Sequence, residues 1–363
     1  MMKGLSSDHQ HGDGYFSDLT TSKLQLLSQG ASVLLTPSCT HSLEMASMLG
    51  KIAPGDEVIL PSFNFSSGAI AIERFGGIPV FVDIDPVTKC IDIAGARAAV
   101  TKKTKAISWV NYAGLSPNME EMATLANDFD LFLIEDNAHG LGGTFRDKYL
   151  GTFGDVSTLS FHSTKNIQCG EGGALVVNDE NLLELARIIR EKGTNRAEFL
   201  IGAVQKYEWV GPGSSYLMAE ILAAVLLGQL EMFDQIQSNR VASWGRYYSF
   251  FSNLDSERFK LPTNNFQENK NIAHNFYVEL QSQEERMRFT KILSKNQIEA
   301  AFHYQPLHLS PAGRKYFPHG MRLEHTERVS QTILRLPLYF DLEEEIWDKL
   351  ETSVTEFRKI LKE

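Results

Sequence analysis

Short apolar runs alternate with longer stretches of helical spacing through the first two-thirds of the chain. The runs predict strands over residues 32–35, 58–60, 80–82, 106–110, 131–134, 158–161 and 175–177. Continuous rather than alternating apolarity is typical of parallel strands that are buried on both faces. The pattern therefore predicts an α/β domain in which helices flank both faces of a mostly parallel sheet.

The last third of the chain predicts a smaller α/β domain. A long helix over about 216–250, whose continuity through its middle is left open, bridges to it. Two further strands are expected over 276–280 and 300–304, and two further helices over 284–296 and 343–361. We therefore divide the chain into a large domain, residues 1–240, and a small C-terminal domain, residues 241–363.

Composition excludes several classes of function. The chain has 363 residues, of which 43% are hydrophobic and 22% charged, as in soluble globular proteins. Its net charge of −10 argues against nucleic-acid binding, which needs a basic face. The most apolar helical stretch, 217–230, is too short to span a bilayer and contains Glu220 and Gln229. No membrane partner is therefore expected.

Cysteine and histidine usage points to a cytoplasmic protein without a metal. Cys39, Cys90 and Cys169 have no paired spacing, which fits a reducing compartment, and no basic-then-apolar leader opens the chain. His9, His11 and Asp13 could bind a metal, but we expect a mobile N-terminal segment instead.

The segment around Lys165 is the strongest candidate for chemistry. An apolar stretch over 156–161 precedes the lysine, and a glycine-rich turn over 170–173 and a new apolar run follow it. These flanks place Lys165 in a loop between two strands, where backbones pack closely. A desolvated amine there can lose its proton and form a Schiff base with an aldehyde cofactor. A solvated surface lysine is the alternative interpretation.

Asp136 follows a continuous apolar run directly and so stands at the end of a buried strand. Ligands of parallel sheets lie beyond the carboxyl ends of the strands, so this carboxylate should face the ligand crevice. An aspartate of this kind can hold a proton on the ring nitrogen of pyridoxal phosphate (PLP). The alternative is a helix N-cap or a turn residue, for which Asp is equally suited.

Small polar side chains at 38–40 suggest a phosphate site. Ser38, Cys39 and Thr40 follow a predicted strand and precede helical spacing over 41–49. A helix start offers free backbone N–H groups and a positive dipole end to an anion. Ser160 could add a further hydroxyl. Ordinary N-capping by Ser38 or Thr40 is the alternative.

Taken in order, Ser38, Cys39, Thr40, Phe65, Asp136, Ser160 and Lys165 resemble the DegT/StrS family of sugar-nucleotide aminotransferases. The resemblance extends from about Gly12 to the C-terminus. It implies PLP as cofactor, the PLP fold type I, catalytic roles for Lys165 and Asp136, stacking of Phe65 on the cofactor ring, and phosphate contacts from 38–40 and Ser160.

Two positions depart from the family pattern. The family's Gln three residues after the strand-end Asp is His139 here, and an imidazole can donate the same hydrogen bond. The family's phosphate-binding Asn from a neighbouring subunit has no match over 214–217, where Ser215 is our substitute. The resemblance thereby implies a homodimer with shared sites.

The resemblance also implies the substrates, L-glutamate and a keto-sugar nucleotide. Segments 34–40, 190–196, 213–218 and 302–308 favour amination at C4 of dTDP-4-keto-6-deoxyglucose, with a galactose product, as in surface polysaccharide biosynthesis. The expected substrate-binding residues are Arg196, His303, Tyr304 and His308. The alternatives are a C3 or other sugar-nucleotide aminotransferase, a sugar dehydratase, which Lys165 disfavours, and a non-catalytic PLP-binding protein.

Overall fold

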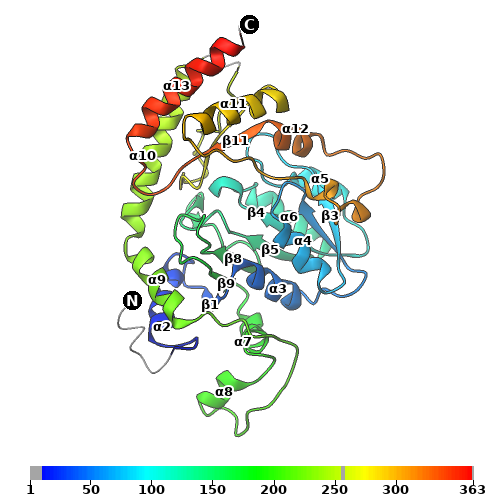
Figure 1. Ribbon diagram of the computed structural model, residues 1–363. Coiled ribbons are helices and arrows are strands. Elements are labelled where there is room, and N and C mark those ends of the chain that lie inside the picture. The colour runs from blue at the N-terminus through cyan, green and yellow to red at the C-terminus, as the bar shows by residue number, and fades with distance from the viewer. Residues whose placement is uncertain (1–9, 255–257, 362–363) are drawn as a thin grey trace.

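The computed structural model describes residues 10–254 and 258–361 (Figure 1). In this part of the chain one seven-stranded sheet has the order β1-β9-β8-β5-β4-β2-β3. Its strands are β1 (Ser32–Thr36), β2 (Glu57–Pro61), β3 (Ile78–Val82), β4 (Thr104–Val110), β5 (Phe132–Asp136), β8 (Val156–Ser160) and β9 (Gly173–Val177). Each predicted run overlaps one of these strands, so the predicted strands of the sheet are confirmed.

The sheet is mostly parallel, as predicted. Strands β8, β5, β4, β2 and β3 pair in parallel, whereas β9 is antiparallel to both of its neighbours, β8 and β1. Because the five parallel strands point the same way, their carboxyl ends meet at one edge of the sheet, where ligands bind in open α/β folds.

Helices cover both faces because successive strand residues point to opposite sides. One face packs against α3 (Cys39–Leu49), α4 (Ser66–Glu73) and α7 (Leu183–Arg190), and it includes Leu34 and Ile134. The other face includes Leu35 and Leu133. It packs against α2 (Tyr15–Leu26), α5 (Ile93–Ala98), α6 (Met119–Phe129) and α9 (Glu220–Glu231). The predicted arrangement of helices on both faces is confirmed.

The predicted long helix over 216–250 is two helices. The first, α9, begins at Glu220, and the second, α10, spans Phe233–Ser252, with Met232 between them in a non-helical conformation. The Glu220 carboxylate accepts hydrogen bonds from the backbone N–H groups of Gly14 and Phe16 and thereby fixes the start of α2 against α9. Because α9 begins at Glu220 and the predicted helix began at 216, the predicted start was four residues too early.

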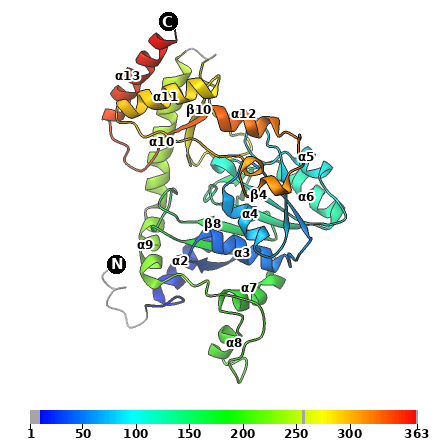
Figure 2. The ribbon, with the colours of Figure 1, turned by 45° about the vertical axis from the view of Figure 1, so that its right-hand side comes forward.

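A second, smaller core lies above the sheet (Figure 2). There β10 (Phe276–Glu279) pairs antiparallel with β11 (Ile333–Leu336), beside α10, α11 (Gln283–Lys295), α12 (Glu324–Thr332) and α13 (Glu345–Ile360). The predicted boundary at 240/241 falls inside α10, and the division into domains stays a prediction. The predicted strand over 300–304 was wrong, because only Ala301 forms a bridge, to Arg335.

Short elements complete the described chain. A hairpin of β6 (Thr144–Phe145) and β7 (Lys148–Tyr149) follows β5, and α8 (Arg196–Leu200) follows α7. The 3₁₀ turns are η1 (Tyr112–Gly114), η2 (Glu180–Leu182), η3 (Leu307–Leu309) and η4 (Arg314–Tyr316). Both ribbon views show α8 and its adjoining loop projecting from the body, at the end opposite α13 (Figures 1 and 2).

Candidate active site

A cavity of about 420 Å³ lies at the carboxyl ends of the parallel strands. Its walls come from the last residues of β4, β5 and β8, from the start of α3, and from the loop that carries Lys165. The small core closes it with His303, Tyr304 and Arg335. Most of the predicted site residues therefore line one cavity: Ser38, Cys39, Thr40, Phe65, Asp136, His139, Ser160, Lys165, His303 and Tyr304.

Asp136 is the last residue of β5 and is buried in the cavity wall. Its carboxylate accepts the Ala138 backbone N–H at 3.1 Å and the Thr158 hydroxyl at 3.5 Å. Burial raises the pKa of this carboxyl despite those bonds. The adjacent Glu135 points to the other side of the strand, where it accepts backbone N–H groups, so strand alternation places Asp136 and not Glu135 in the cavity.

Lys165 lies in the loop between β8 and β9. Its backbone N–H donates to the His162 carbonyl at 2.9 Å, and the Asn166 side chain ties the loop to the Ile272 carbonyl at 2.8 Å. The side chain keeps some exposure, but loss of water around the amine lowers its pKa, and the charge of Arg335 lowers it further. The amine makes no hydrogen bond or ion pair within the described residues. Lys165 lines the cavity, and its role as a nucleophile stays a prediction.

The start of α3, where the anion site is predicted, lines the cavity with Ser38, Cys39 and Thr40. The Ser38 side chain caps the helix by accepting the His41 backbone N–H, so the ordinary capping interpretation of Ser38 also holds. A Cβ on Gly173 would come within 2.4 Å of the Cys39 nitrogen, so only glycine allows β9 to pack against this turn. Thr40 meets Ser67 at 2.8 Å and thereby joins the first turns of α3 and α4.

Cys39 is not arranged as a nucleophile. Its thiol donates to the Thr158 hydroxyl at 3.5 Å, and burial beside Asp136 raises its pKa well above the ordinary value. A thiol held protonated is a weak hydrogen-bond donor rather than a reactive thiolate. Phe65 also lines the cavity, and the residue is 61% exposed.

His139 is a neutral imidazole in a stack of rings. Its ring lies 4.0 Å from that of His274, and burial lowers the pKa of both far below the ordinary value. Nδ1 accepts the Ala113 backbone N–H at 3.4 Å, which assigns the ring proton to Nε2, and Nε2 donates to the Tyr304 hydroxyl at 3.4 Å. His139 can therefore donate a hydrogen bond from within the cavity.

His303 and Tyr304 form the wall on the side of the small core. Their rings stack at 4.1 Å, and the Tyr112 hydroxyl meets Nδ1 of His303 at 3.3 Å. Burial lowers the pKa of His303 to about 2, so this imidazole is also neutral. Both side chains offer polar atoms without charge, which suits recognition of sugar hydroxyls more than of phosphates.

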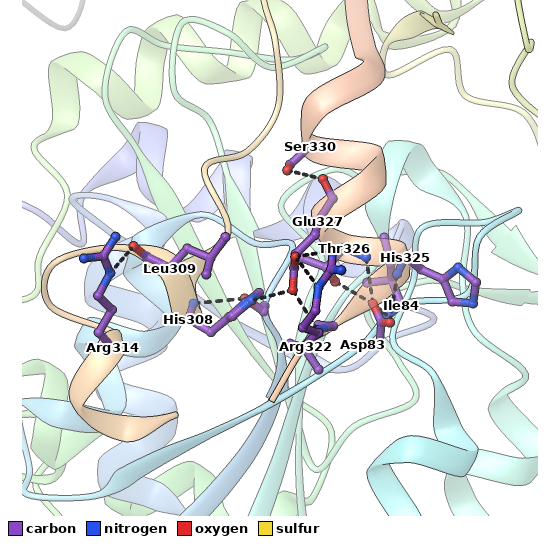
Figure 3. Close-up of polar contacts among 12 residues, drawn as sticks. Asp83, Ile84, His308, Leu309, Arg314, Arg322, His325, Thr326, Glu327 and Ser330 are labelled. Carbon is purple, nitrogen blue, oxygen red and sulfur yellow. Dashed lines mark hydrogen bonds and ion pairs between the residues drawn. The ribbon is translucent and has the colours of Figure 1, made fainter. Parts of the chain in front are cut away.

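Three predicted residues lie outside the cavity within one protomer. Arg196 pairs with Glu191 at 3.2 Å, Ser215 is exposed beside the same segment, and His308 is buried. Figure 3 shows His308 facing Glu327, with 3.6 Å between Nε2 and the carboxylate. Its Nδ1 accepts the Ser62 hydroxyl at 2.6 Å. The ligand-binding roles of these three residues stay predictions.

Sequence reasoning missed several residues of the cavity wall, chiefly Asn64, Ser67, His274 and Arg335. Arg335 had a usable signal, because it is a charged residue inside the short apolar run 333–336. His274 had none, since only the packing of residues far apart in the chain brings it beside Lys165.

The sequence also matches a known family. Residues 21–355 match the model of the DegT/DnrJ/EryC1/StrS aminotransferase family. The chain belongs to this family. A curated relative is the spore coat polysaccharide biosynthesis protein SpsC of Bacillus subtilis. It is 32% identical over 332 residues, which cover 89% of this chain and 84% of SpsC. The uncharacterized protein MJ1066 of Methanocaldococcus jannaschii is 33% identical over 83% of this chain and 79% of its own.

Solved structures with a similar fold support the same family. The putative sugar aminotransferase Spr1654 of Streptococcus pneumoniae, in its PMP form, has a TM-score of 0.90 and 25% identity, over 99% of this chain and 94% of its own. DesV of S. venezuelae has a TM-score of 0.88 and 27% identity, over 98% of this chain and 92% of its own. This DegT/DnrJ/EryC1/StrS protein is a PLP-dependent sugar aminotransferase of PLP fold type I.

The cavity fits PLP on its own physical grounds. The buried Asp136 carboxylate has a raised pKa because its charge is not fully compensated, and a protonated pyridine nitrogen would supply the missing positive charge. The two helix starts joined by Thr40 and Ser67 offer N–H groups to a phosphate. The amine of Lys165 has no competing partner among the described residues. Asp136, the start of α3 and Lys165 would hold the cofactor at three points.

The described residues contain neither a metal-binding cluster nor a membrane-spanning helix. Within residues 10–254 and 258–361, no three or more His, Cys, Asp or Glu side chains gather so as to hold a metal ion. His9, from the metal cluster considered above, lies outside these residues. In the same ranges no helix has the length and apolarity needed to cross a membrane.

Proposed function

We propose that this sugar aminotransferase transfers the amino group of L-glutamate to C4 of dTDP-4-keto-6-deoxyglucose, giving the galactose-configured 4-amino-4,6-dideoxy sugar. The observation that carries the proposal is the convergence of Lys165, Asp136, the start of α3 and His303–Tyr304 on one cavity of about 420 Å³. Uncharged sugar-facing groups and a nucleophilic amine stand on two sides of the same space.

Each residue has a distinct task. PLP, when bound, supplies an aldehyde carbon and an electron sink. The lowered pKa of Lys165 leaves more of its amine neutral, so Nζ can attack a carbonyl carbon and later carry the proton from the α-carbon of the donor. The Asp136 carboxylate holds a proton on the pyridine nitrogen. His139 Nε2–H donates a hydrogen bond without a change of charge.

The choice of C4 over C3 rests on the resemblance of segments 34–40, 190–196, 213–218 and 302–308 to C4 aminotransferases. His303 and Tyr304, from the last of these segments, line the cavity and support a contact with the sugar ring. Amination at C3, or of another keto-sugar nucleotide, is the second candidate. The similarity to SpsC, a spore coat polysaccharide biosynthesis protein, supports a place in surface polysaccharide biosynthesis.

A homodimer is part of the proposal. The projecting loop after α8 carries large apolar side chains in water, of which Ile201 is 80% exposed and Trp209 83%. Apolar surface gathered on a projecting segment is typical of an interface. A second copy of this chain would cover it, and Arg196 and Ser215, at the base of the same segment, would then be available to the site of the partner.

The position and configuration of the new amine on the sugar product test the proposal. The protein would be incubated with PLP, ¹⁵N-labelled L-glutamate and dTDP-4-keto-6-deoxyglucose, and the purified sugar nucleotide examined by NMR. We expect ¹⁵N on C4, with the small H3–H4 coupling of an axial amine. A large H3–H4 coupling would reject the galactose configuration, and unlabelled sugar would reject this substrate. The same assay with a 3-keto-6-deoxy sugar nucleotide would test the second candidate, which places ¹⁵N on C3.

A further inference from the structure

The imidazole of His274 packs face to face against His139 in the wall of the catalytic cavity. The two ring centres are 4.0 Å apart, and the ring planes differ by 21°. His274 is 7% exposed, so the contact is buried. Because Ala113 and Tyr304 hold the two nitrogens of His139, the stacked ring of His274 completes the fixation of that imidazole.

A hydrogen bond ties His274 to the residue that follows Lys165. Nδ1 of His274 lies 3.0 Å from Oδ1 of Asn166. The Nδ2 group of Asn166 donates to the Ile272 carbonyl at 2.8 Å and to Oε1 of Gln237 at 2.9 Å. These two acceptors fix the orientation of the amide, so its Oδ1 must accept. Nδ1 of His274 therefore carries the ring proton.

The two stacked rings are consequently neutral and of opposite tautomers. Burial lowers the pKa of His274 far below the ordinary value, and the charges of Lys165 and Arg240 lower it further. His274 has its proton on Nδ1, whereas His139 has its proton on Nε2. Nε2 of His274 has no hydrogen-bond partner within the described residues. The other tautomer of His274 would break the bond to Asn166.

The backbone that carries His274 is held in a strained conformation. Ala273 has a φ of +48°, in the left-handed region that non-glycine residues rarely adopt. The buried Arg240 donates to the Ala273 carbonyl at 3.0 Å and to the His274 carbonyl at 2.7 Å. It also donates to the Leu338 carbonyl at 2.8 Å. Strained backbone persists only where the surroundings hold it, and such positions gather at functional sites.

Helix α10 connects this arrangement to both cores. Its first part packs against the large sheet through Ile236, and its later part packs in the small core through Trp244. Gln237 and Arg240, whose side chains hold Asn166 and the backbone at His274, lie between these two parts. The position of His274 is therefore set by the large sheet and the small core together.

We propose that His274 is a positioning residue for the reaction with PLP. Through Asn166 it holds the loop of Lys165 so that the amine faces the cofactor, and through its ring it holds His139 in the plane from which Nε2–H donates. The inference rests on the proposed role of Lys165, but it goes beyond the proposed function because it does not depend on the sugar.

The first test measures the tautomers in the full-length protein. Long-range ¹H–¹⁵N spectra would be recorded at pH 7 on protein with ¹⁵N-labelled histidine, with and without PLP. Signals would be assigned by their loss in His274→Asn and His139→Gln. We expect the proton of His274 on Nδ1 and the proton of His139 on Nε2. A proton on Nε2 of His274 would overturn the inference, because the bond to Asn166 would then not exist.

The second test separates the hydrogen bond of His274 from its ring stacking. His274→Asn presents an amide N–H near the place of Nδ1 and so keeps a donor to Asn166 without the ring. His274→Phe keeps a ring against His139 but has no donor. Cofactor-free protein would be mixed with PLP in a stopped-flow instrument, and the rise of the band of the lysine-bound cofactor recorded. The control is His319→Asn, at an exposed position.

We expect His274→Phe to slow the rise of this band by about 10- to 100-fold, because the amine of Lys165 is no longer held in place. His274→Asn should recover most of the rate and be less than about threefold slower than wild type. His319→Asn should match wild type. The inference is overturned if His274→Phe reacts as fast as wild type, or if His274→Asn is as slow as His274→Phe. If His274→Phe does not fold by circular dichroism, the tautomer measurement decides.

The failure of the proposed function would look different. A protein in which Lys165→Ala still formed the band would remove the role of Lys165. A protein that formed the band as predicted, yet transferred no amine to dTDP-4-keto-6-deoxyglucose, would remove the proposed substrate and leave the role of His274 intact.

Discussion

At the scale of single residues, the site combines two ionisable groups whose environments oppose their usual charge. Burial raises the pKa of Asp136 and lowers the pKa of Lys165, so each is held closer to its neutral form than it would be in water. A cofactor with a cationic ring nitrogen and an aldehyde satisfies both groups at once. The cavity is therefore already preorganised to bind PLP.

Replacement of Lys165 tests the nucleophile. We expect Lys165→Ala to keep the fold and to lower the turnover rate by about 10²- to 10⁴-fold, because a positioned proton carrier is lost. Added methylamine should restore part of the rate, a result that a merely structural lysine would not give. Steady-state kinetics would measure both effects, with the exposed Lys102→Ala as control. Unchanged turnover in Lys165→Ala would contradict the assignment.

Replacement of Asp136 tests its burial. Because the folded pKa is raised, the carboxyl contributes fully to stability only below its unfolded pKa, and this contribution is lost as pH rises through the folded value. Cofactor-free Asp136→Asn should therefore melt about 1–3 °C above wild type at pH 7. The difference should vanish below about pH 4.

With PLP bound, wild type should instead melt at a higher temperature than Asp136→Asn, since the amide of the variant cannot neutralise the charged ring nitrogen. Thermal melts from pH 4 to 8, with and without PLP, would measure these differences. A cofactor-free Asp136→Asn that melts below wild type at pH 7 would show that the buried carboxylate is already compensated.

At the scale of elements, runs of apolar residues predicted the strands of the large sheet and the residues at their ends. Lys165 and Asp136 were predicted to lie at the cavity because Asp136 ends an apolar strand and Lys165 lies in the loop after another, and the same apolar runs predicted the strands of the large sheet. The strand over 300–304 was wrong, because the segment pairs with β11 only at Ala301. Pairing partners distant in sequence leave no local signal, and His274 was missed for that reason, whereas Arg335 was overlooked although its charge inside an apolar run marked it.

The segment 303–308 divides into a cavity-facing part and a structural part. His303 lines the cavity, whereas His308 joins η3 to β2 through Ser62 and faces Glu327 of α12 (Figure 3). Asp83, after β3, accepts the Thr326 backbone N–H at 2.8 Å and holds the same helix start. This network fixes the end of the segment that carries His303.

Two alanine variants should separate these tasks. His308→Ala should lower the free energy of unfolding by about 2–4 kcal/mol, because a buried hydrogen-bonded ring is lost. His303→Ala should lower it less and should instead raise KM for the sugar nucleotide. Denaturant melts and steady-state kinetics would measure the two effects. If His308→Ala were as stable as wild type, the hydrogen bonds of His308 would not contribute to stability, contrary to the prediction.

At the scale of the whole molecule, the projecting loop after α8 is the feature that one chain does not explain. Both views show it clear of the sheet and of the small core (Figures 1 and 2). Its apolar side chains have no cover in the described protomer, and the predicted partner contact through Ser215 lies at its base. Assembly and catalysis should therefore depend on the same segment.

Charges placed on the loop should separate the subunits. We expect the double variant Ile201→Asp, Trp209→Asp to sediment as a monomer and to lose most of its activity, because a buried unpaired carboxylate is unfavourable in an interface. Val87→Asp is the matched control, since Val87 is 52% exposed on a turn outside that loop. A wild-type protein that sediments as an active monomer would contradict the homodimer.

The central claim is that one cavity carries out both halves of an amine transfer. The most direct measurement is the visible absorption spectrum of the PLP-loaded protein, taken after addition of L-glutamate and again after addition of dTDP-4-keto-6-deoxyglucose. We predict that glutamate abolishes the band of the lysine-bound cofactor, that the keto sugar restores it, and that Lys165→Ala never shows it. A PLP-treated wild-type protein with no such band, or with a band that glutamate leaves unchanged, would contradict the account.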